Sequence, residues 1–166
     1  MPVKEMISNM GKRFVSEGLA DATIVAADIS LIHAKNRRVW HKSDINNSMV
    51  SRSRIDTEAR WGFAKTKSWM FGYKLHLSCS TGPLVVSLST DFSTANVSDN
   101  QMYCNRIEPL PNNTVRYVAT DLGYDDHKLY DFSKNHGITL VCPIRRYRST
   151  KGKRLKLVQF YKSDAG

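Results

Sequence analysis

Apolar positions near the start of the chain recur at the spacing of an amphipathic helix. The segment is residues 3–19, VKEMISNMGKRFVSEGL. Its apolar residues, four to five positions apart, are Met6, Met10, Phe14 and Leu19. This spacing predicts a helix with these residues on its apolar face. Gly11 weakens such a helix, and Gly18 is typical of the position just past a helix end.

Three later segments have the apolar and β-branched composition of buried strands. Residues 23–33, TIVAADISLIH, are the first, although Asp28 interrupts the apolar run in its middle. The stretch VRYVATDLGYDD begins as the second strand and reaches an acid at Asp121. The last is ITLVCPI, residues 138–144. Two of the three predicted strands therefore carry a carboxylate inside the strand or at its end.

Strict alternation in residues 69–80, WMFGYKLHLSCS, predicts a half-exposed strand. The apolar members Tyr73, Leu75 and Leu77 alternate with the polar members Lys74, His76 and Ser78. A turn signal, Thr-Gly-Pro at 81–83, follows, and residues 83–90, PLVVSLST, have the composition of a partner strand. The two strands are therefore predicted to form an antiparallel hairpin.

Two segments carry helix signals. Residues 96–108 offer Ser98 and Asp99 as N-cap candidates and end before a proline, and residues 125–136 begin with two acids and end before Gly137. Residues 35–68 lack apolar periodicity and are predicted to form a long basic loop. The resulting order of elements mixes antiparallel neighbours with βαβ-like crossovers. It predicts one α/β domain built on a mixed sheet flanked by helices.

Composition and charge indicate the class of partner that the protein binds. The 166 residues suit one domain, and 41% hydrophobic residues are enough for a core. The three cysteines form no CxxC pair, so neither a zinc site nor a disulfide framework is indicated. No apolar run has the length of a membrane span, and the first residues show no secretory signal. We therefore expect a cytoplasmic protein without a membrane partner, whose net charge of +10 favours a polyanion.

The basic residues concentrate in two zones, one within residues 37–67 and one at 145–156, RRYRSTKGKRLK. Aromatic residues beside these zones favour a nucleic-acid surface over a merely solvated face or flexible loop, because rings stack on bases. For the histidine at position 76, a plain surface residue is the alternative to a phosphate contact. The residues that we expect to contact DNA are Lys74, His76, Arg145, Arg146, Arg148, Lys151, Lys153 and Arg154.

Asp28 and Asp121 are candidate metal ligands. A lone buried carboxylate is costly unless it is paired or bound to a cation. Two such acids on adjacent strands form a like-charge pair that a divalent metal offsets, and their oxygens suit Mg²⁺ or Mn²⁺. The alternative is that they are strand-end acids that cap turns or pair with arginine. Asp125 and Asp126 fit the start of a helix better than a metal site.

Four segments occur in the same order as in a known family. They are ADISLIHA around Asp28, RIDTEARWGFAKTKSWMFGYKLHL, STANVSDNQ, and ATDLGYDD followed by GITLVCPIRR. Together they span residues 21–148 and resemble the bacterial insertion-sequence transposases of the DDE type. The resemblance implies an RNase H-like fold, a mixed sheet in which Asp28 and Asp121 lie on neighbouring strands. These residues would be the first two acids of the catalytic triad.

The resemblance also implies an activity and its partners. It implies Mg²⁺- or Mn²⁺-dependent cleavage at transposon ends and transfer of the freed 3′-OH to target DNA, in a nucleoid-associated protein. Lys74 and His76 would lie on a strand near the site, and Tyr124 matches the tyrosine that follows the second acid. The sequence leaves the oligomeric state open, a homo-oligomer included.

The chain departs from the family at the third acid, a glutamate well downstream of the second aspartate. Its four glutamates are Glu5, Glu17, Glu58 and Glu108, and all precede Asp121. We therefore expect a C-terminally truncated transposase with little or no transposition activity alone. Its parts would be a helical remnant at 1–20, an incomplete RNase H-like DDE core at 21–148, and a basic tail at 149–166 that leads to the missing segment. The alternatives are a noncatalytic DNA-binding remnant and a hydrolytic nuclease of RNase H-like fold.

Overall fold

The computed structural model describes residues 2–34, 56–64, 68–111 and 113–144, and the statements below concern these residues. The elements in chain order are α1 (Val3–Ser16), β1 (Ile24–His33), β2 (Arg60–Ala64), β3 (Ser68–Ser80), β4 (Ser87–Thr94), α3 (Asp99–Ile107), β5 (Tyr117–Thr120), the 3-10 turn η2 (Leu122–Tyr124), α4 (His127–Asn135) and β6 (Thr139–Val141). The predicted mixed α/β architecture is confirmed.

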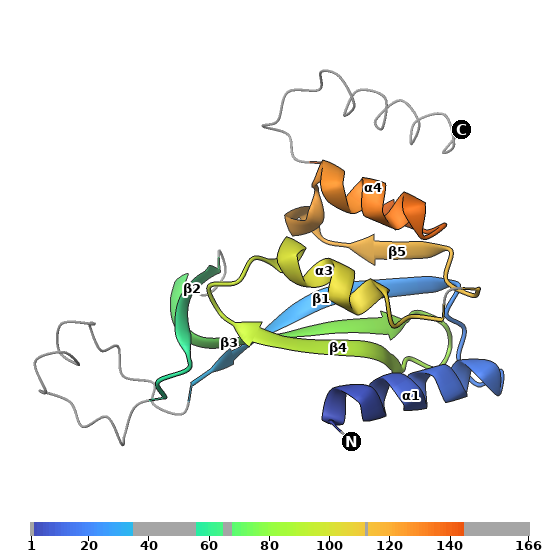
Figure 1. Ribbon diagram of the computed structural model, residues 1–166, viewed down its shortest axis with the longest axis horizontal. Helices are drawn as coiled ribbons and strands as arrows, with labels where there is room; N and C mark the ends of the chain where they lie inside the picture. Colours follow the sequence, from blue (N-terminus) through green and yellow to red (C-terminus); the bar gives the residue numbers. More distant parts are fainter. Residues whose placement is uncertain (1, 35–55, 65–67, 112, 145–166) are drawn as a thin grey trace, which may run out of the picture.

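The sheet has two halves that meet at β1. On one side, β1 pairs antiparallel with β3, and β3 in turn pairs antiparallel with β2 and β4. On the other side, β1 pairs parallel with β5, and β5 pairs parallel with β6. Parallel neighbours need crossover connections, which α3 and α4 provide. The mixture of antiparallel neighbours and crossovers that the sequence predicts is therefore confirmed, with β1 at the junction (Figure 1).

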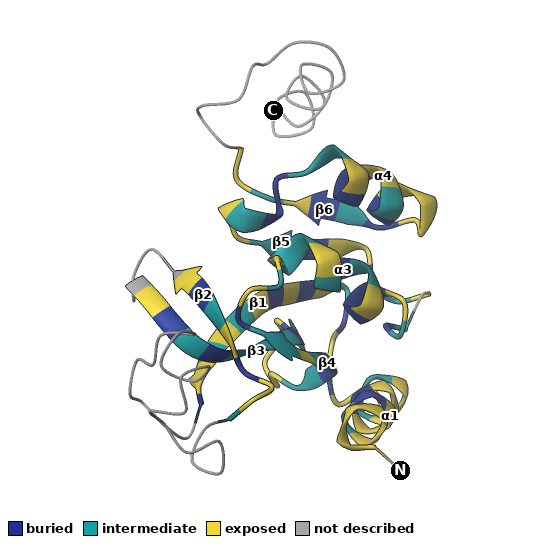
Figure 2. Ribbon diagram, turned by 60° about the vertical axis from the view of Figure 1, so that its left-hand side comes forward, coloured by how far each residue is buried: buried dark blue, intermediate teal, exposed yellow. Residues whose placement is uncertain are grey.

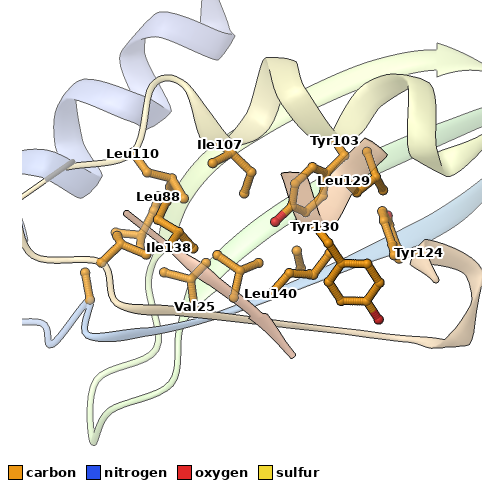
Figure 3. Packing of buried hydrophobic residues seen from close by; sticks show 14 residues of the cluster. Val25, Leu88, Tyr103, Ile107, Leu110, Tyr124, Leu129, Tyr130, Ile138 and Leu140 are labelled. Carbon is orange, nitrogen blue, oxygen red and sulfur yellow. The ribbon is translucent and has the colours of Figure 1, made fainter. Parts of the chain in front are cut away.

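The hydrophobic core lies between the sheet and the helices α3 and α4. Figure 3 shows this cluster, to which β1 contributes Val25 and its neighbour two positions along, Ala27. The other core members labelled there are Leu88, Tyr103, Ile107, Leu110, Tyr124, Leu129, Tyr130, Ile138 and Leu140. Side chains alternate between the two faces of a strand, so Asp28 lies on the face of β1 opposite to the core. The alternation of buried and exposed residues along β1 is visible in Figure 2.

The helix at the N-terminus is confirmed, but the face that it buries differs from the predicted one. Met6 and Met10 are exposed, whereas Ser8 and Gly11 are buried against the sheet. A Cβ on Gly11 would lie 2.7 Å from the backbone oxygen of Ser87 at the start of β4. This glycine therefore permits a close approach of helix and strand, which places the small residues inward and leaves the methionines outside.

Part of the predicted basic loop is a strand. β2 pairs with β3 through two cross-strand aromatic contacts, with ring centroids 5.4 Å apart for Trp61 and Phe71 and 5.5 Å apart for Phe63 and Trp69. Such cross-strand pairs stabilise a hairpin, and they are the signal that the loop prediction missed. The rest of the predicted loop, residues 35–55 and 65–67, lies outside the described residues.

The remaining helix and strand predictions are confirmed with small shifts in their bounds. β4 begins at Ser87, four residues after the predicted start of the hairpin partner at 83. The Asp126 carboxylate caps α4 by accepting a hydrogen bond from the Lys128 amide at 2.9 Å. Gly137 follows α4 with φ of 68°, the left-handed conformation that favours glycine. No described helix has both the length and the apolar character needed to cross a membrane.

Candidate active site

The parallel register between β1 and β5 brings the two candidate acids side by side. Ala27 of β1 is the partner of Thr120 of β5, at the end of an unbroken one-to-one register. The next position on each strand is an aspartate, Asp28 on β1 and Asp121 directly after β5. Asp121 keeps an extended backbone, with φ of −81° and ψ of 177°, so its side chain continues the alternation of the strand. Both acids therefore lie on the same face of the sheet, at adjacent positions.

Both carboxylates lie at an open surface and not in a buried pocket. Each residue is exposed, so the prediction that burial strains Asp28 inside its strand is wrong. The Asp28 carboxylate accepts a hydrogen bond from the Ile29 amide at 2.7 Å, and the Asp121 carboxylate accepts one from the Gly123 amide at 2.9 Å. Two like charges at adjacent positions would repel each other, and a bound cation would relieve that repulsion.

The capping alternative is partly correct for Asp121. Its bond to the Gly123 amide closes the 3-10 turn η2, so the same carboxylate caps a turn and faces the other acid. Pairing with arginine, the second half of that alternative, is not observed among the described residues. The ion pairs found in the described part of the chain join Lys4 with Asp91, Arg13 with Glu17, and Lys74 with Asp99. Neither candidate ligand takes part in them.

The oxygen atoms of this acid pair fit a hard divalent cation. Mg²⁺ takes one or two protein carboxylates and completes its shell with water and phosphate oxygens, which an exposed pair permits. Within the described residues, three or more Asp, Glu, His or Cys side chains nowhere gather as a metal cage. Cys79, Cys104 and Cys142 are free thiols. The described site therefore offers two ligands and no third.

Lys74 and His76 do not lie where the sequence predicts. They occupy the covered face of β3, with only 8% and 0% of their surface exposed, while Tyr73 and Leu75 point to the opposite face. The prediction that these two polar side chains contact DNA is corrected by their burial, and so is the alternative of a surface histidine. The reason is that α3 and the segment before it cover the polar side of the strand.

The covered polar side chains of β3 have partners from the α3 region. The Lys74 ammonium forms an ion pair with Asp99 at 2.9 Å and donates to the Val97 carbonyl at 2.7 Å. The Nε2 atom of His76 lies 2.8 Å from the Ser93 hydroxyl. Burial lowers the pKa of His76 to about 4, and the nearby Arg106 charge acts in the same direction. The pair between Lys74 and Asp99 thus fixes the N-terminus of α3 on the sheet, while His76 stays neutral.

A further residue, Arg106, lies beside the acid pair and is not predicted from the sequence. Arg106 on α3 is fully buried and donates to the carbonyl oxygens of Asp28 at 3.3 Å and Leu77 at 3.0 Å. It also donates to the Tyr124 hydroxyl at 2.7 Å. Burial raises the pKa of Tyr124 to about 12, against the opposing effect of the Arg106 charge. The sequence signal that could have predicted its inward position is helical spacing. Arg106 follows the apolar Tyr103 by three positions and so shares its inward face.

The face of the sheet that carries the acids also carries exposed aromatic residues. Trp69 and Phe63 in the β2–β3 hairpin expose 66% and 60% of their surface. The registers of β2, β3 and β1 place these rings on the same face as Asp28. The other predicted DNA contacts, which are Arg145, Arg146, Arg148, Lys151, Lys153 and Arg154, lie outside the described residues.

Comparison with protein families identifies the class. The family described as the Transposase DDE domain matches residues 19–165, and the chain belongs to this family. The prediction of a DDE transposase is therefore confirmed at the level of the family, whose members use a divalent metal ion. The RNase H-like mixed sheet is confirmed as well: the antiparallel strands β4, β3 and β1 lie side by side and continue into the parallel strands β5 and β6.

Two solved structures show a weak likeness to this chain. One is a piggyBac transposase synaptic complex with hairpin DNA, with 13% identity, a TM-score of 0.49, and coverage of 82% of this chain and 26% of that chain. The other is a simian T-cell lymphotropic virus intasome in complex with PP2A regulatory subunit B56 gamma, with 14% identity, a TM-score of 0.43, and coverage of 89% and 43%. This chain therefore spans about a quarter of the first and less than half of the second. No curated protein matches.

The ion pair between Lys74 and Asp99 predicts a stability defect. In Lys74→Met, the partly buried Asp99 carboxylate loses its cation, and we expect the free energy of unfolding to fall by about 2–3 kcal/mol. Lys128→Met on the exposed surface of α4 is the matched control, with an expected change within about 0.5 kcal/mol. Urea unfolding monitored by circular dichroism measures both. Equal losses in the two variants would contradict the structural role of Lys74.

The buried neutral state of His76 predicts a dependence of stability on pH. Its pKa is about 4 in the folded protein and about 6.5 in the unfolded chain, so the unfolded chain binds a proton first as the pH falls. The contribution of neutral His76 to the free energy of unfolding is fully present above pH 6.5. It is lost as the pH falls toward 4, by up to about 3 kcal/mol. Urea unfolding at several pH values should show a shallower decline for His76→Gln than for the unaltered protein. The exposed His33→Gln should retain the steep decline, and a steep decline in His76→Gln would refute the assignment.

Proposed function

We propose that this chain forms the catalytic core of an insertion-sequence transposase, which holds a divalent metal between Asp28 and Asp121 and binds DNA. The observation that supports the proposal is the register of β1 and β5, which pairs Ala27 with Thr120, the residues directly before the two aspartates. Membership of the Transposase DDE domain family supports the chemistry, since the acids of a DDE site are its metal ligands.

Asp28 and Asp121 would hold a Mg²⁺ or Mn²⁺ ion, which would supply Lewis-acid stabilisation of a phosphoryl oxygen in phosphoryl transfer. The role of the chain is to present two carboxylates on rigid strands and to hold DNA beside them. The backbone amides of Ile29 and Gly123 orient these carboxylates through hydrogen bonds at 2.7 and 2.9 Å. Orientation of this kind supports metal binding because the ligands are held in place before the ion arrives.

DNA binding is supported by charge and by the exposed rings. The net charge of +10 attracts a polyanion, and the basic run at 145–156 contains no acid. Trp69 and Phe63 present apolar rings on the face of the sheet that carries Asp28, where they are suited to stacking on bases. Transposon ends and target DNA are the proposed partners, which places the protein with the nucleoid in the cytoplasm. A homo-oligomer of this chain is also part of the proposal.

The second candidate is a noncatalytic DNA-binding protein with the same fold. It is favoured by the position of all four glutamates before Asp121, so that none follows the second acid as the family triad requires. Two carboxylates suffice for one Mg²⁺ with water, whereas the complete triad holds two metal ions. The two candidates agree on metal and DNA binding and differ only in catalysis.

A strand-transfer assay separates these candidates. The chain is incubated with plasmid DNA, oligonucleotides that bear free 3′-OH ends, and Mg²⁺ or Mn²⁺. We expect strand transfer no greater than that of the matched Asp28→Asn variant, because no glutamate follows Asp121 in this sequence. Efficient metal-dependent joining by the unaltered chain, lost in Asp28→Asn, would overturn this expectation and show that the chain is catalytically active.

The salt dependence of DNA binding tests which basic residues contact phosphate. Changing the six basic residues at 145, 146, 148, 151, 153 and 154 to glutamine should reduce the slope of log K against log salt by up to about 5. Lys74→Met should leave the slope unchanged, since its ammonium is held by Asp99. Lys128→Gln is the control for loss of one surface charge elsewhere. Fluorescence anisotropy with a duplex at several salt concentrations gives the slopes, and an unchanged slope in the six-residue variant would remove this segment from the interface.

A further inference from the structure

We propose that Arg106 is a positioning residue, which fixes the spacing between the backbone segments that carry Asp28 and Asp121. The inference rests on the proposed function, since it concerns the same acid pair. Arg106 lies in the last turn of α3, on the core side of the sheet, whereas the two carboxylates lie on the opposite face. It therefore acts from beneath the site and touches neither carboxylate.

One guanidinium group joins three segments that meet at the acids. Its Nη1 atom donates to the carbonyl of Asp28 on β1 and to that of Leu77, the register partner of Asp28 on β3. Its Nη2 atom donates to the hydroxyl of Tyr124, three residues after Asp121. The same side chain thus ties the strand of the first acid to the turn that follows the second.

The buried position of Arg106 is not explained by stability, because burying its charge is energetically unfavourable. Arg106 is fully buried, and the described residues place no carboxylate within ion-pair distance of it. Its Nε atom also lacks a hydrogen-bond partner in the described part of the chain. A buried cation without a carboxylate partner is unfavourable even with the centroid of the Tyr124 ring 5.4 Å from its Cζ atom, and an apolar residue of similar volume is usually at least as stabilising. Tyr103 and Ile107 fill the neighbouring inward positions of α3 as apolar core residues.

The geometry of the guanidinium group explains why an arginine occupies this position despite that cost. Arginine presents its donors in a planar fork, which reaches two carbonyls with one nitrogen and a hydroxyl with the other. A lysine ammonium would keep the charge but concentrate its donors at one point. The buried positive charge also lies beneath two like-charged acids and opposes their repulsion before a metal binds. Mg²⁺ demands near-ideal octahedral geometry, so the spacing of the two acids decides how well it binds.

Two buried tyrosines in the same core provide a matched pair of variants. Tyr124→Phe removes the hydroxyl that Arg106 holds, whereas Tyr103→Phe removes a hydroxyl that lies 2.8 Å from the Ser133 hydroxyl. Both residues are fully buried, and their rings lie 5.9 Å apart. A purely structural role predicts similar effects of the two changes. A positioning role predicts that only Tyr124→Phe disturbs the acid pair.

The experiment measures binding of Mn²⁺ alone by electron paramagnetic resonance, and hydrogen exchange of the Ile29 and Gly123 amides in metal-free protein. We expect the Kd for Mn²⁺ to rise about five- to ten-fold in Tyr124→Phe and less than about two-fold in Tyr103→Phe. We also expect faster exchange at both amides in Tyr124→Phe alone. Arg106→Lys, where it folds, should resemble Tyr124→Phe because it keeps the charge and loses the fork.

The outcomes separate this inference from the proposed function. Equal effects of the two tyrosine changes on both readouts would overturn the positioning role and leave the metal site intact. If the unaltered protein binds no Mn²⁺, the proposed metal site fails, and amide exchange alone decides the positioning role. Faster exchange in Tyr124→Phe but not in Tyr103→Phe would then still support it.

Discussion

The parallel pairing of β1 with β5 is the constraint on which the site depends. A register that advances one residue at a time from Ile24 and Tyr117 brings Asp28 to the side of Asp121. A slip of one residue would move one carboxylate to the core face, since side chains alternate with a period of two. Val25, Ala27 and Val118 fill the core and thereby prevent that slip. Hydrophobic burial on one face therefore places the charged pair on the other.

The core side of the sheet is unusual because it is polar over β3. Lys74, His76 and Ser78 lie inward there, and α3 meets them with Asp99 and Arg106. Polar groups in such a layer are costly unless satisfied, so they specify how α3 docks more strictly than an apolar contact would. Two of these contacts hold opposite ends of α3 on the sheet. The ion pair of Lys74 fixes its start, and the hydrogen bonds of Arg106 fix its last turn beside the acids.

Much of the fold could be predicted from the sequence, because strands and helices with regular periodicity carry local signals. The run around Asp28, the alternation of residues 69–80 and the capped helix after Asp126 are examples. What failed was the assignment of faces. Alternation shows that Tyr73 and Lys74 point opposite ways, but polar residues conventionally point outward, and the sequence does not reveal that α3 covers the polar side. The same limit applies to α1, where the close approach at Gly11 overrides the methionine face.

The candidate acids were predictable for a different reason. Asp28 and Asp121 interrupt or end apolar strands, which is a local signal, and their adjacency follows from the parallel order of those strands. Arg106 was missed because a single arginine in a helix is ordinarily a surface residue, and its partners are backbone carbonyls and a hydroxyl distant in sequence. Contacts of that kind leave no pattern in one sequence.

The most direct test of the account is a double-mutant cycle on Mn²⁺ binding with Asp28→Asn, Asp121→Asn and the double variant, and with the exposed Asp131→Asn as control. If the two acids form one site, the unaltered protein binds one Mn²⁺ there, each single change weakens it at least about ten-fold, and the double change adds little more. Independent, additive losses, or binding unaffected by either change, would contradict the adjacency of the two acids as a metal site.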